Sequence, residues 1–489
     1  MKTNQLAATA AAVFGLAGAV SNAEAVDVFA SGSSAGRQFI NEVPLSVCDH
    51  TAGPITHYQS SNNNTHLWKC KFNGQDINFH YSARGSSDGP YPTDDLTGGD
   101  RSKGKYNGKG YLGYIDANNP ATSNCGTLTT NVPKTFYDVD TATIVTVNIS
   151  ENKTCANPPS GVTQDYPTPI FVRQPTDFGF SDVQFTSFGQ SSPAGTEPAD
   201  PAPNITEHKL MVLPFSIVVQ NNVRRVDAAG NNIGPVQNLT QTEIEQIFAR
   251  KARDWRELGY AVTNDLAGTQ AVPSGPHTIR LCMREFGSGS KATFDQVLMK
   301  EEAEEWNGAV NNVTFYFASS SGVRDCMNDV QGPGQYGKIG YIDSFESSAS
   351  PAYVVPAVAN PMPNAHPVNI NGFRGVDVTV VDPVKATARP KVLQALRCGK
   401  TEFWVNLEGY TKTAGTGDAT KDAFIARFMS DAANKSVIEN LPANWAFEAT
   451  ENVLATKTED RIAPDHATYT TRAAEYDSQC RGFYASPNP

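Results

Sequence analysis

The stretch TIRLCMREFGSGS, residues 278–290, holds an apolar run, an arginine and a loop of alternating glycine and serine. The run from Thr278 to Met283 predicts a strand. The following segment, with Phe294, Val297 and Leu298 on one face, predicts a helix. Free amides at the start of a helix attract anions, and the planar fork of Arg284 suits an oxyanion. This stretch therefore predicts an anion-binding loop between a strand and a helix.

Two more loops of glycine and serine follow predicted strands. VDVFASGSSAG (residues 26–36) leads into an expected serine-capped helix at Arg37, and DINFHYSARGSSDG (residues 76–89) ends in the same kind of turn. A further motif, TDFGFSD (residues 176–182), places Asp182 at a turn. One such loop is a common connection. Three of them, together with one aspartate, indicate convergence on a single anion.

The rest of the pattern indicates more than one domain, since 489 residues exceed the usual single core. The continuous apolar run LMVLPFSIVVQ (residues 210–220) predicts a strand covered on both faces, which we take as the crossing between two lobes. Residues 238–259 predict a helix, because Thr240 and Glu243 form a capping box and apolar residues recur on one face. Residues 191–204, rich in proline, alanine and serine, predict an exposed loop.

The order and spacing of these motifs resemble the phosphate-binding proteins of ABC phosphate importers, a branch of the type II periplasmic binding proteins. Asp254-Trp255 and Gly340-Tyr341-Ile342 are also similar to that family. The resemblance covers about residues 26–95 and 170–345, and the C-terminal third only loosely. It implies an α/β type II fold with a ligand cleft between two lobes.

The resemblance also implies the lobe boundaries and the ligand set. Lobe 1 is expected over 26–212 with an insertion at about 96–165, lobe 2 over 213–345, and a return to lobe 1 with a C-terminal segment over 346–489. The ligand residues implied are Ser34, Ala35, Ser86, Asp182, Arg284, Ser288, Gly289 and Ser290. No cofactor is expected.

The chemistry of this set fits phosphate. Phosphate at neutral pH still carries a proton, so Asp182 would accept a hydrogen bond from it, whereas fully ionised sulfate would meet only repulsion. Arsenate and organic phosphates remain open. The family often has an acidic residue two positions after the arginine, but Phe286 stands there and Glu285 is displaced by one, so the orientation of Arg284 is open. The resemblance further implies an ABC permease as a membrane partner, and we expect a monomer.

The N-terminus and the cysteines indicate export. Residues 1–25 predict a signal peptide, with an apolar stretch from Leu6 to Val20 and an A-x-A cleavage pattern at residues 23–25, and hence a periplasmic or secreted protein. Eight cysteines form an even set without C-x-x-C, which favours disulfides over zinc. Eight cysteines allow 105 pairings, which the sequence leaves open. The pairing of neighbours in order, which closes the shortest loops, is the one we expect: Cys48–Cys70, Cys125–Cys155, Cys282–Cys326 and Cys398–Cys480.

Charge and the insertion bear on other partners. A net charge of −11 without a run of lysine or arginine argues against nucleic acid and against anionic membranes. The insertion at 96–165 is expected to be rich in loops. The acidic residues at its start, Asp94, Asp95 and Asp100, lack the spacing of a calcium loop and favour a solvated turn, so no metal site is expected.

Two other classes of function compete with a binding protein. Residues 32–36 and 85–89 both match G-x-S-x-G, so a serine hydrolase would use Ser34 or Ser87 with His466 as base, and weak phosphoester hydrolysis belongs to the same alternative. The absence of an HGGG-like oxyanion segment and the frequency of such matches in a serine-rich chain argue against an enzyme. An extracellular adhesion protein that has lost the ligand is the other alternative.

Overall fold

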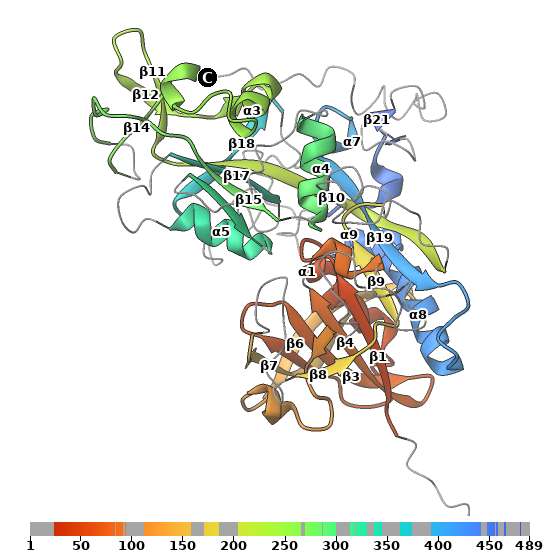
Figure 1. The fold of residues 1–489 in the computed structure, drawn as a ribbon. Helices are drawn as coiled ribbons and strands as arrows, with labels where there is room; N and C mark the ends of the chain where they lie inside the picture. Colours follow the sequence, from red (N-terminus) through yellow and green to blue (C-terminus); the bar gives the residue numbers. More distant parts are fainter. Residues whose placement is uncertain are drawn as a thin grey trace, which may run out of the picture.

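The protein folds into two α/β lobes in the computed structural model (Figure 1). The structure describes residues 24–83, 85–90, 93, 112–157, 171–184, 204–265, 269–285, 287–299, 313–317, 319–329, 337–344, 362–373, 393–441, 447–454, 456–457, 464–465 and 480. Residues 1–23 of the predicted signal peptide, most of the loop at 191–204, the acidic residues 94, 95 and 100, Phe286 and His466 lie outside these ranges. No described helix is long and apolar enough to cross a membrane.

Lobe 1 is built around β1 (Val26–Gly32), which pairs in parallel with β4 (Gln75–Ala83) and β9 (Phe178–Ser181). β3 (Thr65–Phe72) and β2 (Thr56–Ser60) continue the sheet beyond β4. Helices α1 (Arg37–Val47) and α8 (Ala419–Ala432) pack against each other and cover this sheet. The buried rings of Phe79, Phe178, Phe180 and Phe428 form the centre of the resulting core.

One long strand belongs to both lobes. β10 (Ile205–Gln220) pairs with β19 (Trp404–Lys412) through residues 205–214 and with β17 (Lys338–Asp343) through residues 215–219. It is buried from Leu210 to its end, as its apolar sequence predicts. The sheet of lobe 1 therefore continues into the sheet of lobe 2 without a break at the crossing.

Lobe 2 places β15 (Arg280–Arg284) between β17 and β16 (Thr314–Phe317). It also holds β13 (Asn238–Leu239), α3 (Gln241–Phe248), α4 (Gly289–Phe294), which a π turn (Asp295–Met299) continues, and α5 (Ser320–Asn328). A smaller sheet is formed by β11 (Val223–Val226), β12 (Asn232–Pro235) and β14 (Tyr260–Val262). Figure 1 shows α4 and α1 facing each other where the lobes meet.

The capping box of Thr240 and Glu243 is confirmed, but the helix is shorter than the predicted 238–259. The amide of Thr240 donates to Glu243 Oε2 at 2.6 Å, and the amide of Glu243 donates to Thr240 Oγ1 at 3.2 Å. α3 ends at Phe248, and Arg250 adopts a left-handed φ of 57°. A non-glycine residue in that conformation interrupts a helix. A short helical turn (Trp255–Leu258) follows.

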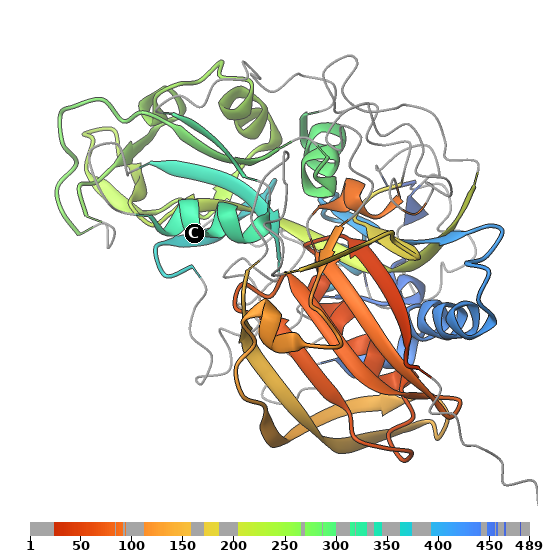
Figure 2. The ribbon, with the colours of Figure 1, turned by 60° about the horizontal axis from the view of Figure 1, so that its bottom comes forward.

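The insertion is less rich in loops than expected. β6 (Thr129–Asp138) and β7 (Thr143–Cys155) form a hairpin that pairs with β2 and extends the lobe 1 sheet (Figure 2). Threonine is frequent in both strands, and β7 also holds several valines and isoleucines; such residues favour a pleated, half-buried surface. β5 (Leu112–Tyr114) pairs separately with β8 (Val172–Gln174).

The C-terminal third is divided between the lobes. β19 and α8 belong to lobe 1, and α9 (Lys435–Glu439) follows them. β18 (Ala365–Ile370), which was expected in lobe 1 with the rest of 346–489, instead pairs with β13 and with residues 217–220 of β10. In lobe 2, β18 therefore occupies the hydrogen-bonding edges of β13 and of the end of β10. The remaining short elements are α7 (Gln394–Arg397), β20 (Thr456–Lys457) and β21 (Pro464–Asp465).

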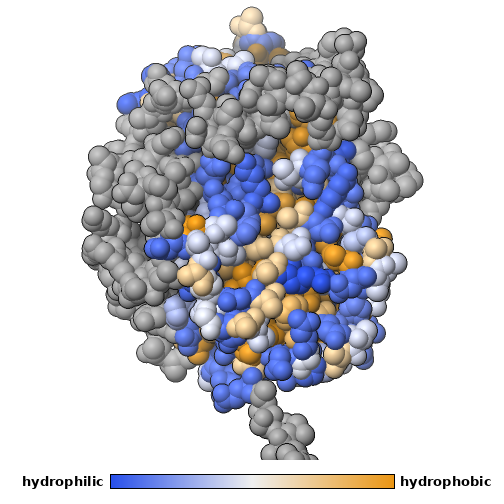
Figure 3. Space-filling view, turned by 90° about the vertical axis from the view of Figure 1, so that its right-hand side faces the viewer, coloured by the Kyte–Doolittle hydropathy of each residue, from blue (hydrophilic) through white to orange (hydrophobic). Residues whose placement is uncertain are grey.

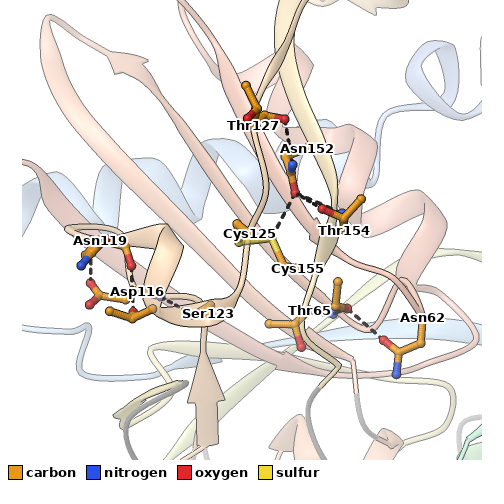
Figure 4. The surroundings of a disulfide bond; sticks show 12 residues. Asn62, Thr65, Asp116, Asn119, Ser123, Cys125, Thr127, Asn152, Thr154 and Cys155 are labelled. Carbon is orange, nitrogen blue, oxygen red and sulfur yellow. Dashed lines mark hydrogen bonds between the residues drawn. A yellow bond between two sulfur atoms is a disulfide. The ribbon is translucent and has the colours of Figure 1, made fainter.

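Four disulfides join Cys48–Cys70, Cys125–Cys155, Cys282–Cys326 and Cys398–Cys480, the same neighbouring pairs that the shortest loops predict. Figure 4 shows Cys125–Cys155, which ties the segment before β6 to the end of β7. Beside it, the side-chain amide of Asn152 donates to the carbonyl of Thr127 at 2.9 Å. Disulfides in these numbers are consistent with an extracytoplasmic location. On the side of β19 and α8, the described surface mixes hydrophilic and hydrophobic residues (Figure 3).

Candidate functional site

The turn after β1 is held against the backbone of β9. Gly32 has a φ of 128°, and a Cβ at this position would lie 1.9 Å from the carbonyl oxygen of Phe180, so only glycine fits. The amide of Ser33 donates to the same carbonyl at 2.9 Å. The Ser33 hydroxyl accepts from the amide of Gly36 at 2.8 Å and donates to Asp182. α1 begins at Arg37 with Gly36, and not a serine, as its N-cap residue.

The turn after β4 reaches both β9 and the loop of lobe 2. A short helical turn (Ser86–Asp88) follows Gly85, and Ser86 bonds to the carboxylate of Asp182. The amide of Ser87 donates to the carbonyl of Gly287 at 3.0 Å, which joins the two lobes directly. The glycine pattern of this G-x-S-x-G match is explained by packing: a Cβ at Gly89 would lie 2.1 Å from the carbonyl oxygen of Phe180.

The loop after β15 enters from lobe 2. Ser288 is the N-cap of α4, and its hydroxyl accepts from the amide of Lys291 at 3.3 Å. A Cβ at Gly289 would lie 2.6 Å from both Ser86 Oγ and Asp182 Cβ, so the loop touches the lobe 1 residues. Ser290 is fully buried, and its hydroxyl has no hydrogen-bond partner among the described residues. Buried hydroxyls without a partner are rare, and this one leaves a hydrogen-bond donor available in the loop.

Arg284, the last residue of β15, is buried and held by several oxygens. Its Nη1 donates to Ser320 Oγ at 2.9 Å, its Nε to the carbonyl of Phe317 at 3.2 Å, and its Nη2 to Ser34 Oγ at 3.5 Å. Burial lowers the pKa of Arg284, and the charge of Asp182 opposes that shift. The side chain therefore remains a cation that spans from lobe 2 to lobe 1.

Asp182 follows β9 at the centre of the cluster. Burial raises the pKa of Asp182, although hydrogen bonds from Ser33 and Ser86 and the charge of Arg284 counteract the shift. The buried phenol of Tyr81 closes the same region by donating to the carbonyl of Ser33 at 2.5 Å. A carboxyl group in this setting can accept a hydrogen bond from a protonated ligand oxygen.

All the predicted residues are buried, and contacts join Ser34 with Arg284, Ser86 with Asp182, and Gly289 with both Ser86 and Asp182. Ser34 and Ala35 lie in the first turn, Ser86 in the second, Asp182 after β9, and Arg284, Ser288, Gly289 and Ser290 in the lobe 2 loop. Sequence reasoning missed Ser33, Arg37, Ser320 and Asp343. Signals existed for two of them, since Ser33 lies within the first Gly/Ser turn and Asp343 directly follows Gly340-Tyr341-Ile342.

Two other sequence features have different positions. Asp177, part of the motif that carries Asp182, accepts from the amide of Phe29 at 2.9 Å and from Lys421 Nζ at 3.2 Å, and so fastens β1 and α8. In the hydrolase alternative, the Ser34 hydroxyl lies against Arg284, and no histidine among the described residues bonds to it. The proposed base, His466, is outside the described ranges.

Comparisons with known proteins concern both sequence and structure. A sequence profile of the PBP superfamily domain matches residues 167–477. A putative phosphate ABC transporter substrate-binding protein with bound phosphate from Clostridium perfringens is similar at 17% identity and a TM-score of 0.32, over 54% of this chain and 78% of that chain. An ABC-type phosphate transport receptor from Vibrio cholerae is similar at 16% identity and a TM-score of 0.29, over 54% and 79%. Because the profile spans well over half of its residues, the chain belongs to the PBP superfamily of solute-binding proteins.

Proposed function

We propose that this protein binds inorganic phosphate, or a closely similar tetrahedral oxyanion, between its two lobes. The observation that supports this most strongly is the convergence of the two lobe 1 turns, Asp182 and the Arg284–Ser290 loop on one buried cluster. Buried charges and hydroxyls that meet from separate elements are costly to assemble, so a functional reason is expected.

The chemistry of the cluster favours an oxyanion that carries a proton. Arg284 supplies a fixed positive charge beside the Ser34 hydroxyl, the Ser86 hydroxyl bonds to Asp182, and the buried Ser290 hydroxyl is a further donor. Asp182 would accept a hydrogen bond from the protonated oxygen of the ligand, while it would repel a fully ionised anion such as sulfate. Each charge-assisted hydrogen bond would contribute on the order of 1.5–3 kcal/mol.

We also propose binding without turnover. Ser34 lies against a guanidinium, which has donors only and cannot take a proton from a nucleophile. On this proposal the protein is exported after loss of residues 1–25, acts as a monomer and delivers its ligand to an ABC-type permease in the membrane, which would recognise the closed lobes.

Isothermal titration of the mature protein, freed of bound anion by partial unfolding and refolding, tests the proposal. Phosphate is expected to bind with a dissociation constant of about 1 μM or below, arsenate comparably and sulfate not at all. Asp182→Ala and Arg284→Ala are each expected to abolish the heat. No heat with any of the three anions would contradict the proposal and leave the adhesion alternative.

A further inference from the structure

Two buried charged residues lie close to the proposed ligand residues but are not among them. Arg37, the first residue of α1, lies in lobe 1, and Asp343, the last residue of β17, lies in lobe 2. Their exposed fractions are 2% and 1%. Burying an unpaired charge costs several kcal/mol, so each must be balanced by a neighbour.

The neighbours form a closed path that crosses between the lobes twice. Arg37 Nη1 donates to the carbonyl of Ser34 at 2.6 Å, and Ser34 Oγ accepts from Arg284 Nη2 at 3.5 Å. Arg284 Nη1 donates to Ser320 Oγ at 2.9 Å, and the Ser320 hydroxyl in turn donates to the carboxylate of Asp343.

The last step of the path is electrostatic. Burial lowers the pKa of Arg37 to about 10, and the charge of Asp343 is the largest influence that opposes this shift. In the other direction, burial raises the pKa of Asp343, and the charge of Arg37 is the largest influence that opposes it. The two groups therefore stabilise each other's charge across the contact between the lobes.

Asp343 also supplies a carboxylate near Arg284, whereas position 286, where the family often has an acidic residue, holds phenylalanine. A hydroxyl that donates to a carboxylate turns its lone pairs toward another donor, so Asp343 fixes Ser320 as an acceptor for Arg284. Arg284, Ser320 and Asp343 all belong to lobe 2, so their arrangement does not depend on closure. Fixing the guanidinium before the ligand arrives reduces the cost of binding.

We propose that Asp343 is a positioning residue that orients Arg284 through Ser320. This inference rests on the proposed oxyanion function and assigns the orientation of its arginine to a carboxylate that follows β17. Phosphate or another oxyanion would then meet Arg284 already held by Ser320.

The direction in which Asp343→Asn changes phosphate affinity distinguishes a positioning role of Asp343 from a purely electrostatic one. Asp343→Asn removes a negative charge close to the site, and Coulomb's law alone predicts tighter binding of an anion. Positioning predicts the opposite, because an amide can turn its NH2 group toward Ser320 and remove the preferred acceptor.

The experiment measures phosphate binding by titration calorimetry in the full mature chain. Asp343→Asn and Ser320→Ala are each expected to weaken binding by on the order of 10-fold, the double variant by about the same factor, and Ser320→Thr, which keeps the hydroxyl, by much less. Matched controls are Asp431→Asn, another buried carboxylate, which accepts from Arg427 at 2.9 Å, and Ser46→Ala, another buried serine. Both controls are expected to bind as the unmodified protein does.

Crystal structures of the unmodified protein and of Asp343→Asn supply a readout that does not depend on binding. The guanidinium of Arg284 is expected on Ser320 in the first and turned away in the second. Equal or tighter binding by Asp343→Asn, or an unmoved Arg284, would overturn the inference. If the unmodified protein binds no phosphate, the proposed function fails, and the position of Arg284 alone then decides whether Asp343 orients it.

Discussion

Gly289 shows how one missing side chain allows the two lobes to meet. A Cβ here would lie 2.6 Å from Ser86 Oγ and from Asp182 Cβ, closer than real Cβ contacts. Gly289→Ala is therefore expected to weaken phosphate binding about 5-fold or more, because overpacking costs roughly 1–3 kcal/mol. Titration calorimetry checks this result. Gly275→Ala is the matched control, since a Cβ at Gly275 meets nothing within 4 Å. Equal affinities for the two variants would contradict the prediction.

Individual residues differ in how far the sequence could identify them. Arg284 and Asp182 stand in motifs whose residue types already indicate an anion, so the sequence places them in one candidate site. Asp343 gives a weaker signal: it directly follows Gly340-Tyr341-Ile342 at the end of a buried strand, but its role depends on Ser320 and Arg37, which are distant in sequence. The choice between Ser33 and Ser34 as partner of Asp182 depends on the turn's backbone, which composition does not determine.

At the scale of elements, strands β2, β3 and β7 enclose a buried imidazole pair. His57 Nε2 and His66 Nδ1 lie 3.1 Å apart, and His57 Nδ1 lies 3.1 Å from Glu151 Oε1. Glu151 in turn pairs with Lys134 and Lys153. Burial lowers the pKa of His57 to about 4, although Glu151 opposes the shift, and burial also lowers that of His66.

This pair predicts a loss of stability in acid. His57 has an ordinary pKa of 6.5 and a folded value of about 4, so between these pH values the unfolded chain binds a proton that the folded chain does not. The stabilisation is complete above about pH 6.5 and is lost toward pH 4, amounting to about 3 kcal/mol for His57. Urea unfolding of the protein and of His57→Gln from pH 4 to 8 measures it. The variant is expected to have the shallower pH dependence, and parallel curves would refute the assignment.

Some helices and strands could be predicted from the sequence and others could not. The apolar run at residues 210–220 predicts its strand because burial on both faces leaves a continuous apolar signal. The hairpin at residues 129–155 was missed although Val145, Val147 and Ile149 alternate with polar residues in β7, because many side chains of the hairpin are exposed and β6 shows no such alternation. The end of α3 was missed because Arg250, an ordinary helix-forming residue, adopts a left-handed conformation there.

At the scale of the whole molecule, the lobes are in contact at the candidate site. The backbone bond from the Ser87 amide to the Gly287 carbonyl, at 3.0 Å, joins residues that only closed lobes bring together. Phosphate is expected to slow hydrogen exchange at the Ser87 amide by stabilising closure. Hydrogen–deuterium exchange of the peptide around residues 85–90, with and without phosphate, provides the test. A peptide from α8 serves as the control, and equal protection in both states would contradict ligand-dependent closure.

The shared strand β10 has a consequence for dissecting the molecule. A cut near residue 212 would pass through a strand that is hydrogen-bonded to β19 on one side of the cut and to β17 and β18 on the other. Each fragment would expose an unpaired sheet edge lined by apolar residues, which is a template for aggregation. The two lobes are therefore separate in shape but inseparable as folding units, and neither half is suited to expression by itself.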